Sequence, residues 1–430
     1  MPTVDLQTIT GLADQTVDWR LRSLPIDAQG MTLAELSAQR RDLFDGGFVG
    51  PVLTLDRTAV EHNLTAMADW CRRGQVDLAP HGKTTMAPQL VADQIAHGAW
   101  GVTVATVAQA RAYRAFGIGP IMIANEIADV GGLRWIAEQQ DADTSLRIVS
   151  WVDSIEGVAA IEAALAGRVP QRALDVLVEL GGPGARAGCR TVAQATVVAE
   201  AVRRSPVLRL VGVTGYERAL VGGLSAAAAT TIDEYLTDLY GLAASLAAAG
   251  HFADGDEVIV SAGGSVYFDR VAALRPSDEL GGLPLRVIIR SGCYLTHDDG
   301  IYRASTPSAR GVEGAPVFRA ALRLWGQVTS RPEPGLALLA MGRRDAPYDE
   351  GLPLPLLVRR VGGVPEPFEG RRIDKLNDQH AFLAVGPADE IGVGDWIGSG
   401  ISHPCTAFDK WKVVTVVDGS TAVGFVRTFF

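Results

Sequence analysis

The feature that most constrains the fold is an alternation of short β-rich apolar runs with alanine-rich segments of helical periodicity. Eight such runs occur, at residues 76–80, 101–105, 120–124, 145–151, 174–180, 209–214, 257–262 and 285–290. Strand and helix alternating in this way predict parallel strands joined by right-handed helical crossovers. Eight units in about 215 residues match the size of a closed (β/α)8 barrel of the TIM type, an α/β fold. A doubly wound open sheet is the alternative, although no Gly-x-Gly-x-x-Gly motif follows the first run to support it.

The sequence changes character after residue 292. Helical periodicity fades, prolines and glycines become frequent, and short strands are predicted at 318–328, 337–341, 380–385 and 413–417. This pattern is typical of a mostly antiparallel β domain. A chain of 430 residues is also longer than most single domains. We therefore expect a barrel domain at residues 51–291 and a C-terminal β domain at residues 292–430.

Composition and charge exclude several classes of function. Hydrophobic residues make up 47% and charged residues 20% of the chain, which is a globular composition. The net charge of −10 argues against a nucleic-acid surface. No uncharged run is long enough to span a bilayer, and the first residues lack a secretory signal, so we expect no membrane partner and a cytoplasmic protein. The four cysteines are scattered without framework spacing, as in a reduced compartment.

A lysine follows the first predicted barrel strand. Pro80 ends that apolar run, and Lys83 comes three residues later, before a helix-like segment. Most lysines are solvated surface charges. However, barrel enzymes carry their chemistry at the carboxyl ends of the strands, so Lys83 is a candidate catalytic residue.

Other strand ends offer the remaining parts of a site for pyridoxal phosphate. After the strand at 257–262, Gly263, Gly264 and Ser265 form a turn whose backbone could approach an anion closely, and phosphate sites are common at this end of barrels. Three further candidates, which could equally be surface or packing residues, are Arg186, Tyr216 and Tyr294. A lysine imine, a partner for the phenolic oxygen, a ring platform and an anion site are what pyridoxal phosphate needs.

A candidate metal motif lies in the second domain. His403 and Cys405 are two residues apart in a segment predicted to be extended, so their side chains would point the same way. Imidazole and thiolate together suit Zn²⁺. Two ligands are half a site, and a buried cysteine beside a structural histidine would look the same in sequence.

These motifs resemble those of one family. Pro80-His81-Gly82-Lys83-Thr84 resembles the lysine motif of the fold-type III pyridoxal-phosphate enzymes of the D-threonine aldolase and D-serine dehydratase family, relatives of alanine racemase. Ser402-His403-Pro404-Cys405-x-Ala407 resembles the metal motif of that family. Further matches follow in the family's order: 51–56 with Asn63, Arg186-x-Gly188, 212–216, 261–265 and Arg290-x-Gly292-x-Tyr294.

The resemblance implies a role for each candidate residue. It implies pyridoxal phosphate bound as a Schiff base to Lys83, with Arg186 at the phenolic oxygen and Tyr216 against the ring. The Gly263-Gly264-Ser265 turn and Tyr294 would hold the phosphate, and His403 with Cys405 would hold a divalent metal such as Zn²⁺. It further implies a homodimer with sites near the subunit interface, and an N-terminal segment, residues 1–50, packed on the β domain.

The resemblance also implies a reaction. Cys405 stands where the aldolase branch tends to carry Asp, and Ala87 stands where the racemases carry Tyr. We therefore expect β-elimination from a D-3-hydroxy amino acid such as D-serine or D-threonine, giving a 2-oxo acid and ammonia. The family often continues Lys-Thr-His-Lys, whereas this chain has Lys83-Thr84-Thr85-Met86, which leaves the substrate open. The alternatives are a metal-dependent D-threonine-type aldolase and a non-catalytic protein that binds pyridoxal phosphate.

Overall fold

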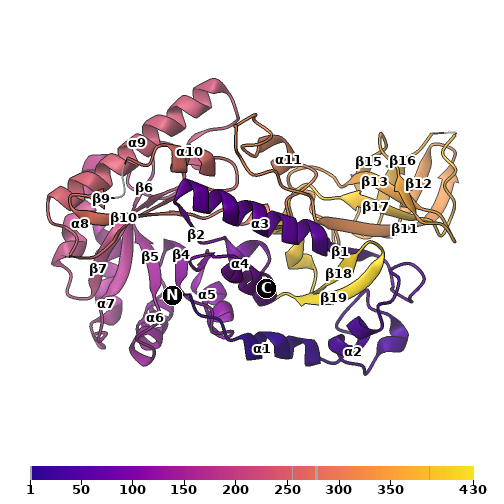
Figure 1. Ribbon diagram of the computed structural model, residues 1–430, viewed down its shortest axis with the longest axis horizontal. Coiled ribbons are helices and arrows are strands. Elements are labelled where there is room, and N and C mark those ends of the chain that lie inside the picture. The colour runs from indigo at the N-terminus through magenta and orange to yellow at the C-terminus, as the bar shows by residue number, and fades with distance from the viewer. Residues whose placement is uncertain (1, 254, 277–278, 387) are drawn as a thin grey trace.

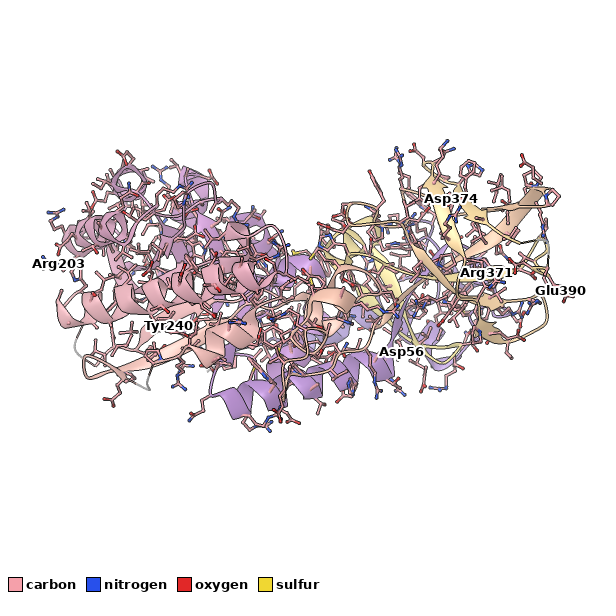
Figure 2. The ribbon with its side chains drawn as sticks, turned by 90° about the horizontal axis from the view of Figure 1, so that it is seen from above. Asp56, Arg203, Tyr240, Arg371, Asp374 and Glu390 are labelled. Carbon is pink, nitrogen blue, oxygen red and sulfur yellow. The ribbon has the colours of Figure 1, made fainter. Side chains whose placement is uncertain are left out.

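The structure is a computed structural model that describes residues 2–253, 255–276, 279–386 and 388–430. It has two lobes, a barrel and a domain built on a large sheet (Figure 1). Figure 2 shows the lobes side by side, with Tyr240 and Arg203 in the barrel and Asp374 and Glu390 in the second domain. No helix in the described ranges is long and apolar enough to cross a membrane.

Eight parallel strands form the barrel in the described part of the chain, as predicted. They are β2 (Asp77–Leu78), β3 (Val102–Val104), β4 (Ile121–Glu126), β5 (Ile148–Val152), β6 (Leu174–Leu180), β7 (Leu208–Gly215), β8 (Val258–Ala262) and β10 (Leu283–Ile289). Neighbours in sequence pair in order from β3 to β8, then β10 and β2. Backbone hydrogen bonds from Trp100 N to Leu78 O (2.7 Å) and from Thr103 N to Pro80 O (2.9 Å) join β2 to β3 and close the ring.

Helices cover the outside of the barrel, and most of them begin at a polar residue whose side chain caps the helix. They are α4 (Pro88–Ala96), α5 (Val107–Arg114), α6 (Val130–Ala142), α7 (Ile155–Leu165), α8 (Val192–Arg204), α9 (Ala226–Ala248) and α10 (Phe268–Ala273). The side chains of Thr106, Asp129 and Ser154 accept backbone N–H bonds at three of these starts, which satisfies otherwise unpaired donors. The barrel interior is filled by apolar side chains from the strands, among them Met122, Trp151 and Ile259.

The second domain is built on a mostly antiparallel sheet. Its strands are β1 (Val52–Asp56), β11 (Leu322–Glu333), β12 (Leu336–Leu339), β13 (Leu354–Arg359), β14 (Pro365–Pro367), β15 (Arg372–Leu376), β16 (Ala381–Ala384), β17 (Trp396–Gly400), β18 (Val413–Asp418) and β19 (Thr421–Arg427). The expected β domain is thus present, and its predicted strands at 318–328, 337–341, 380–385 and 413–417 correspond to β11, β12, β16 and β18.

Strand β1 corrects the expected domain boundary at residue 51. It lies between β11, with which it is antiparallel, and β18, with which it is parallel, so residues 52–56 belong to the second domain. Both faces of this strand are buried, and the sequence of a fully buried strand does not indicate which of the two sheets it joins. The chain then enters the barrel through α3 (Arg57–Gly74), which spans the two lobes in Figure 1.

Asn63 on α3 helps to fix the two domains relative to each other. Its buried amide group donates to Leu295 O (2.9 Å) and to Arg319 O (2.8 Å) and accepts from Arg319 N (2.8 Å). These partners flank the segment that leads from the barrel into β11. Because this buried amide makes three hydrogen bonds, it restrains the segment between Leu295 and Arg319, which leads from the barrel into β11.

The N-terminal segment contacts both domains rather than the β domain alone. It contains α1 (Leu6–Thr10) and α2 (Leu33–Ala38), and side chains between residues 17 and 48 pack with Trp325 and Trp396 of the large sheet. Near its start, however, Thr3 N donates to Gly119 O of the barrel at 2.7 Å. Within this segment α2 ends at Ala38, and Arg40 takes a left-handed conformation.

Candidate active site

A pocket of about 340 Å³ lies at the carboxyl ends of the barrel strands, where the second domain faces the barrel. Most of the predicted site residues line it. These are Lys83, Arg186, Tyr216, Gly263, Gly264 and Ser265 from the barrel, and His403 and Cys405 from the second domain. Residues from distant parts of the chain therefore meet at one place, as the motifs predict.

Lys83 lies in the short 3₁₀ turn η3 (Gly82–Thr84) directly after β2. Its side chain is half-buried and lines the pocket, and no carboxylate in the described ranges forms an ion pair with it. Gly82 is fixed beneath it, since its carbonyl oxygen accepts from the Tyr113 hydroxyl at 2.7 Å. An amine held on a rigid turn without a counter-ion is free to react with an aldehyde.

Arg186 and Tyr216 are brought together by the loops after β6 and β7. The guanidinium carbon of Arg186 lies 5.2 Å from the centre of the Tyr216 ring, a cation–π contact. Gly264 also packs against that ring, where an added Cβ would come within 3.1 Å of Tyr216 Cε2. The absence of a side chain at Gly264 therefore leaves room for the Tyr216 ring.

The predicted phosphate cradle differs from expectation. The backbone amides of Gly263 and Gly264 already donate to the buried Glu217 carboxylate, at 2.9 Å and 3.2 Å. Ser265, Gly292 and Cys293 also line the pocket, and no acceptor in the described part of the chain is paired with their backbone amides. Ser265 and the turn after β10 are thus the donors available to an anion. Glu217, next to Tyr216, already accepts the hydrogen bonds of the two glycine amides.

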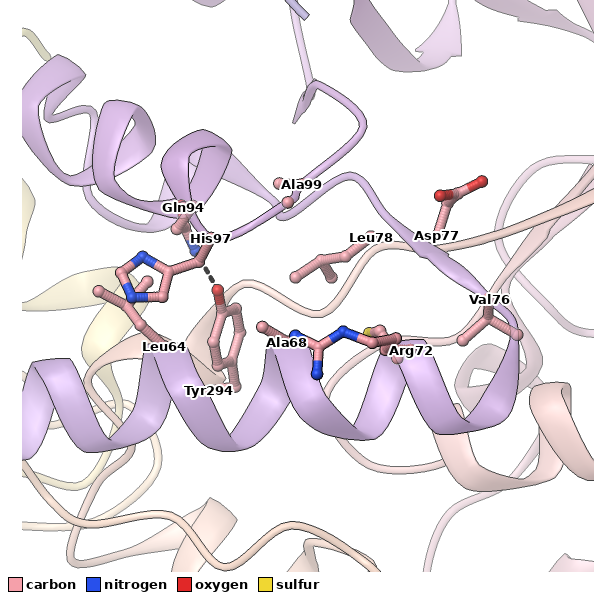
Figure 3. Close-up of a pocket in the computed structure, with 12 residues that line it drawn as sticks. Leu64, Ala68, Arg72, Val76, Asp77, Leu78, Gln94, His97, Ala99 and Tyr294 are labelled. Atoms are coloured by element: carbon pink, nitrogen blue, oxygen red, sulfur yellow. Dashed lines mark hydrogen bonds between the residues drawn. The ribbon is translucent and has the colours of Figure 1, made fainter.

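Tyr294 does not reach the pocket. Its ring is buried between α3 and the barrel, and Gln94 Nε2 donates to its hydroxyl at 3.1 Å (Figure 3). It lines a separate cavity together with Leu64, Leu78 and His97. Tyr294 follows η5 residue Cys293 directly, so the turn sends the Cys293 side chain to the pocket and the tyrosine away from it. The expected phosphate contact of Tyr294 is therefore not supported.

His403 and Cys405 lie where β17 leads into the turn η6 (Pro404–Thr406). His403 Nδ1 is 2.7 Å from Asp349 Oδ2, so this carboxylate orients the ring and leaves Nε2 toward the pocket. Burial opposes a charge on His403, but Cys405 and Asp349 outweigh it and raise the pKa of the imidazole to about 9. A hydrogen bond from Cys293, together with His403, holds the pKa of the Cys405 thiol well below its usual range. Imidazole and thiolate are thus paired.

Sequence reasoning missed four residues at this site. They are Arg290, Cys293, Tyr302 and Asp349. The Arg290 guanidinium is buried at the pocket and donates to Ser261 Oγ (2.7 Å) and Gly215 O (2.6 Å). Its position at the end of the eighth predicted strand was a signal, whereas nothing in the pattern around Asp349 or Tyr302 distinguishes them from surface or packing residues.

The donor set fits pyridoxal phosphate. An unpaired lysine, free backbone donors, an arginine on a tyrosine ring and a buried arginine line one cavity, and its lining includes no Asp or Glu within the described ranges. The fit to a metal is partial. His403 and Cys405 offer two donors, and no group of three His, Cys, Asp or Glu side chains in the described residues surrounds one point. Substrate and water could complete an open catalytic site.

Two family models match the chain. The model of the alanine racemase N-terminal domain matches residues 55–269, half of the chain, and a serine dehydratase domain model matches residues 321–417. The chain belongs to the alanine racemase family. It is a fold-type III enzyme of the branch that contains D-serine dehydratase and D-threonine aldolase, as the motifs predicted.

Individual relatives agree with this membership. The D-threonine aldolase of Arthrobacter sp. is 26% identical over 348 residues, covering 78% of this chain and 80% of its own length. The structure of D-threonine aldolase from Filomicrobium marinum superposes with a TM-score of 0.72 at 24% identity, covering 89% and 95% of the two chains. D-threo-3-hydroxyaspartate dehydratase from Delftia sp. HT23 gives a TM-score of 0.68 at 20% identity, covering 90% and 99%. These structures share the barrel and the second domain, which supports the fold.

Proposed function

We propose that this pyridoxal-phosphate-dependent lyase eliminates water from a D-3-hydroxy amino acid, that hydrolysis of the elimination product then gives a 2-oxo acid and ammonia, and that the enzyme uses a divalent metal such as Zn²⁺. One observation carries the proposal: the pocket joins Lys83 of the barrel to His403 and Cys405 of the second domain. A protein that only carried the cofactor would have no need for the oriented imidazole and thiolate opposite the lysine. The substrate would be a small amino acid such as D-serine or D-threonine.

Each residue has a defined task in this reaction. Pyridoxal phosphate, when bound, supplies an aldehyde for the substrate nitrogen and a ring that withdraws electrons from Cα. The Lys83 amine, once free, removes the proton from Cα. Arg186 holds the Tyr216 ring in place, and the backbone amides of Ser265, Gly292 and Cys293 would be available to hold the phosphate.

The metal pair addresses the poor leaving group. Hydroxide departs slowly unless the charge on its oxygen is stabilised, and a divalent ion on His403 and Cys405 would supply this as a Lewis acid. The hydrogen bond between Asp349 and Nδ1 of His403 would leave Nε2 as the nitrogen available to the metal. The pocket is rich in positive charge, from Lys83 and Arg290 among others, which suits a substrate carboxylate.

The second candidate is a metal-dependent aldolase that breaks the Cα–Cβ bond of the same substrates. The 26% identity to the D-threonine aldolase of Arthrobacter sp. over most of both chains favours it as much as the dehydratase relatives favour elimination. What supports elimination is the thiol of Cys405 in the metal motif. The homodimer and the cytoplasmic location rest on the resemblance and the composition, and stay predictions.

Product analysis distinguishes the candidates. The protein is supplied with pyridoxal phosphate and Zn²⁺ and given D-threonine, D-serine or D-threo-3-hydroxyaspartate, with the L-isomers as controls. Elimination yields ammonia and a 2-oxo acid, which from D-threonine is 2-oxobutyrate. Glycine plus acetaldehyde would identify the aldolase instead. If neither product forms, with or without a chelator, the protein is not a lyase of these substrates.

A further inference from the structure

Two cysteines from opposite domains meet at the pocket. Cys293 lies in η5 (Cys293–Leu295) after the last barrel strand, and Cys405 lies in η6 of the second domain. Their sulfur atoms are 3.3 Å apart. A disulfide bond requires about 2.05 Å, so the two sulfurs need to approach by roughly 1.3 Å, which is within reach of small side-chain rotations.

The backbone around the pair holds this geometry. The chain that follows Cys293 runs beside the chain that precedes Cys405, with Asp299 N donating to Ile401 O at 3.0 Å and Ile301 N to Ser402 O at 3.3 Å. Between them, Gly300 lies so close that an added Cβ would be 2.6 Å from Ser402 Cα. The segment that joins the domains therefore holds the two cysteines next to each other.

The other two cysteines lack this arrangement. The Cys189 thiol donates to Asp153 O at 3.1 Å, and Cys71, on α3, is buried in the apolar core. In contrast, Cys293 and Cys405 both line the pocket that the substrate would enter. A small polar oxidant that enters the pocket therefore meets two thiols side by side.

We propose that Cys293 and Cys405 form a reversible disulfide when hydrogen peroxide enters the pocket. In the first step the sulfur of Cys405, the more exposed of the two, attacks the peroxide oxygen, which breaks the O–O bond and gives a sulfenic acid and water. The Cys293 sulfur then attacks the Cys405 sulfur, which forms the S–S bond and releases a second water. Two thiols are oxidised, one peroxide is reduced to two waters, and a dithiol reductant reverses the change.

The cross-link has two consequences. It ties the end of the barrel covalently to the second domain, and it removes Cys405 from its pairing with His403. The second consequence rests on the proposed function, because activity is lost only if Cys405 holds a metal needed for the reaction. The cross-link itself rests on the geometry alone, so the two are tested separately.

The test treats the full-length protein with hydrogen peroxide, both as purified and after removal of metal with a chelator. Free thiols are counted under denaturing conditions, and non-reducing peptide mapping identifies any cross-link. We expect two of the four thiols to disappear, a Cys293–Cys405 peptide pair, and full recovery with dithiothreitol. Cys293→Ser and Cys405→Ser should each abolish the cross-link, whereas Cys71→Ser and Cys189→Ser should each leave it unchanged.

The outcomes are decisive in either preparation. A cross-link only after chelation still supports the pair, and shows that a metal protects it. Persistence of all four thiols in both preparations, or oxidation of Cys405 to sulfinic acid with no cross-linked peptide, would overturn the proposal. A cross-link without loss of lyase activity would leave the disulfide standing and contradict the metal role of Cys405 instead.

Discussion

At the residue scale, the chemistry depends on whether Lys83 is the amine that binds the cofactor. Lys83→Ala should abolish the visible absorption band of lysine-bound pyridoxal phosphate and lower kcat by at least roughly 10³-fold, because both the covalent anchor and the base are lost. Absorption spectra of the protein with added cofactor check this. Lys375→Ala, on strand β15 of the second domain and outside the pocket lining, is the matched control and should keep both band and activity. If Lys83→Ala kept the absorption band, Lys83 would not be the amine that binds the cofactor.

A second residue of interest is Glu126, at the end of β4 beside the pocket. Burial first, and the neighbouring Glu179 second, raise the pKa of Glu126 to about 8. The pKa of a glutamate in an unfolded chain is about 4.3. Between that pH and about pH 8, the folded state therefore binds a proton that the unfolded state lacks. Stability therefore falls as the pH rises through this window.

Glu126→Gln should remove that dependence, since an amide can donate to Glu179 and has no proton to lose. We expect it to stabilise the protein at pH 8.5 by roughly 1–3 kcal/mol relative to the unchanged chain, with a smaller gain at pH 6. Urea unfolding at the two pH values measures this. Glu234→Gln on the exposed face of α9 should change stability by less than about 0.5 kcal/mol at either pH. Equal pH dependence in Glu126→Gln and the unchanged chain would contradict the interpretation.

At the scale of elements, β7 shows how backbone shape places the site. Its pairing with β6 shifts at Val211, so that Val176 faces Leu210 but Leu177 faces Gly212. Gly212 has φ +152°, and an added Cβ would lie 1.9 Å from Ile259 O of the neighbouring strand. This irregularity bends the strand that delivers Tyr216 to the pocket.

Gly212→Ala should therefore destabilise the protein by about 2–4 kcal/mol, because β7 and β8 must separate to admit the methyl group. Thermal or urea unfolding gives the value. The control is Gly241→Ala within α9, where an added Cβ meets nothing within 4 Å and should stabilise the helix by about 0.5–1 kcal/mol. A Gly212→Ala protein as stable as the parent would show that the strand spacing is not rigid.

The sequence predicted the eight barrel strands well, because each is a short apolar run bounded by turn residues, a local signal. It misassigned β1, since a fully buried strand carries no mark of which sheet it joins. The Gly263-Gly264 turn was located correctly, but its amides were not free, because Glu217 reaches them from another strand end. Likewise, Asp349 and Cys293 join the site only through pairings between residues far apart in sequence, which a single sequence does not reveal.

At the scale of the whole molecule, the pocket exists only where the two domains meet. The barrel region expected from sequence, residues 51–291, should not fold alone. It would retain β1 without β11 and β18, exposing Leu53 and Leu55, which are 1% exposed in the whole chain. We expect this fragment to aggregate or show no cooperative thermal transition by circular dichroism and size-exclusion chromatography. The full-length chain is the control, and a monodisperse, cooperatively unfolding fragment would contradict the expectation.

The place of β1 between β11 and β18 also bears on how the chain is made. On the ribosome, β18 follows residues 52–56 by roughly 360 residues. At about 5–20 residues per second, this apolar strand waits about 20–70 s for its last neighbour. The barrel can close during that delay, whereas the sheet around β1 stays incomplete until β18 has been made.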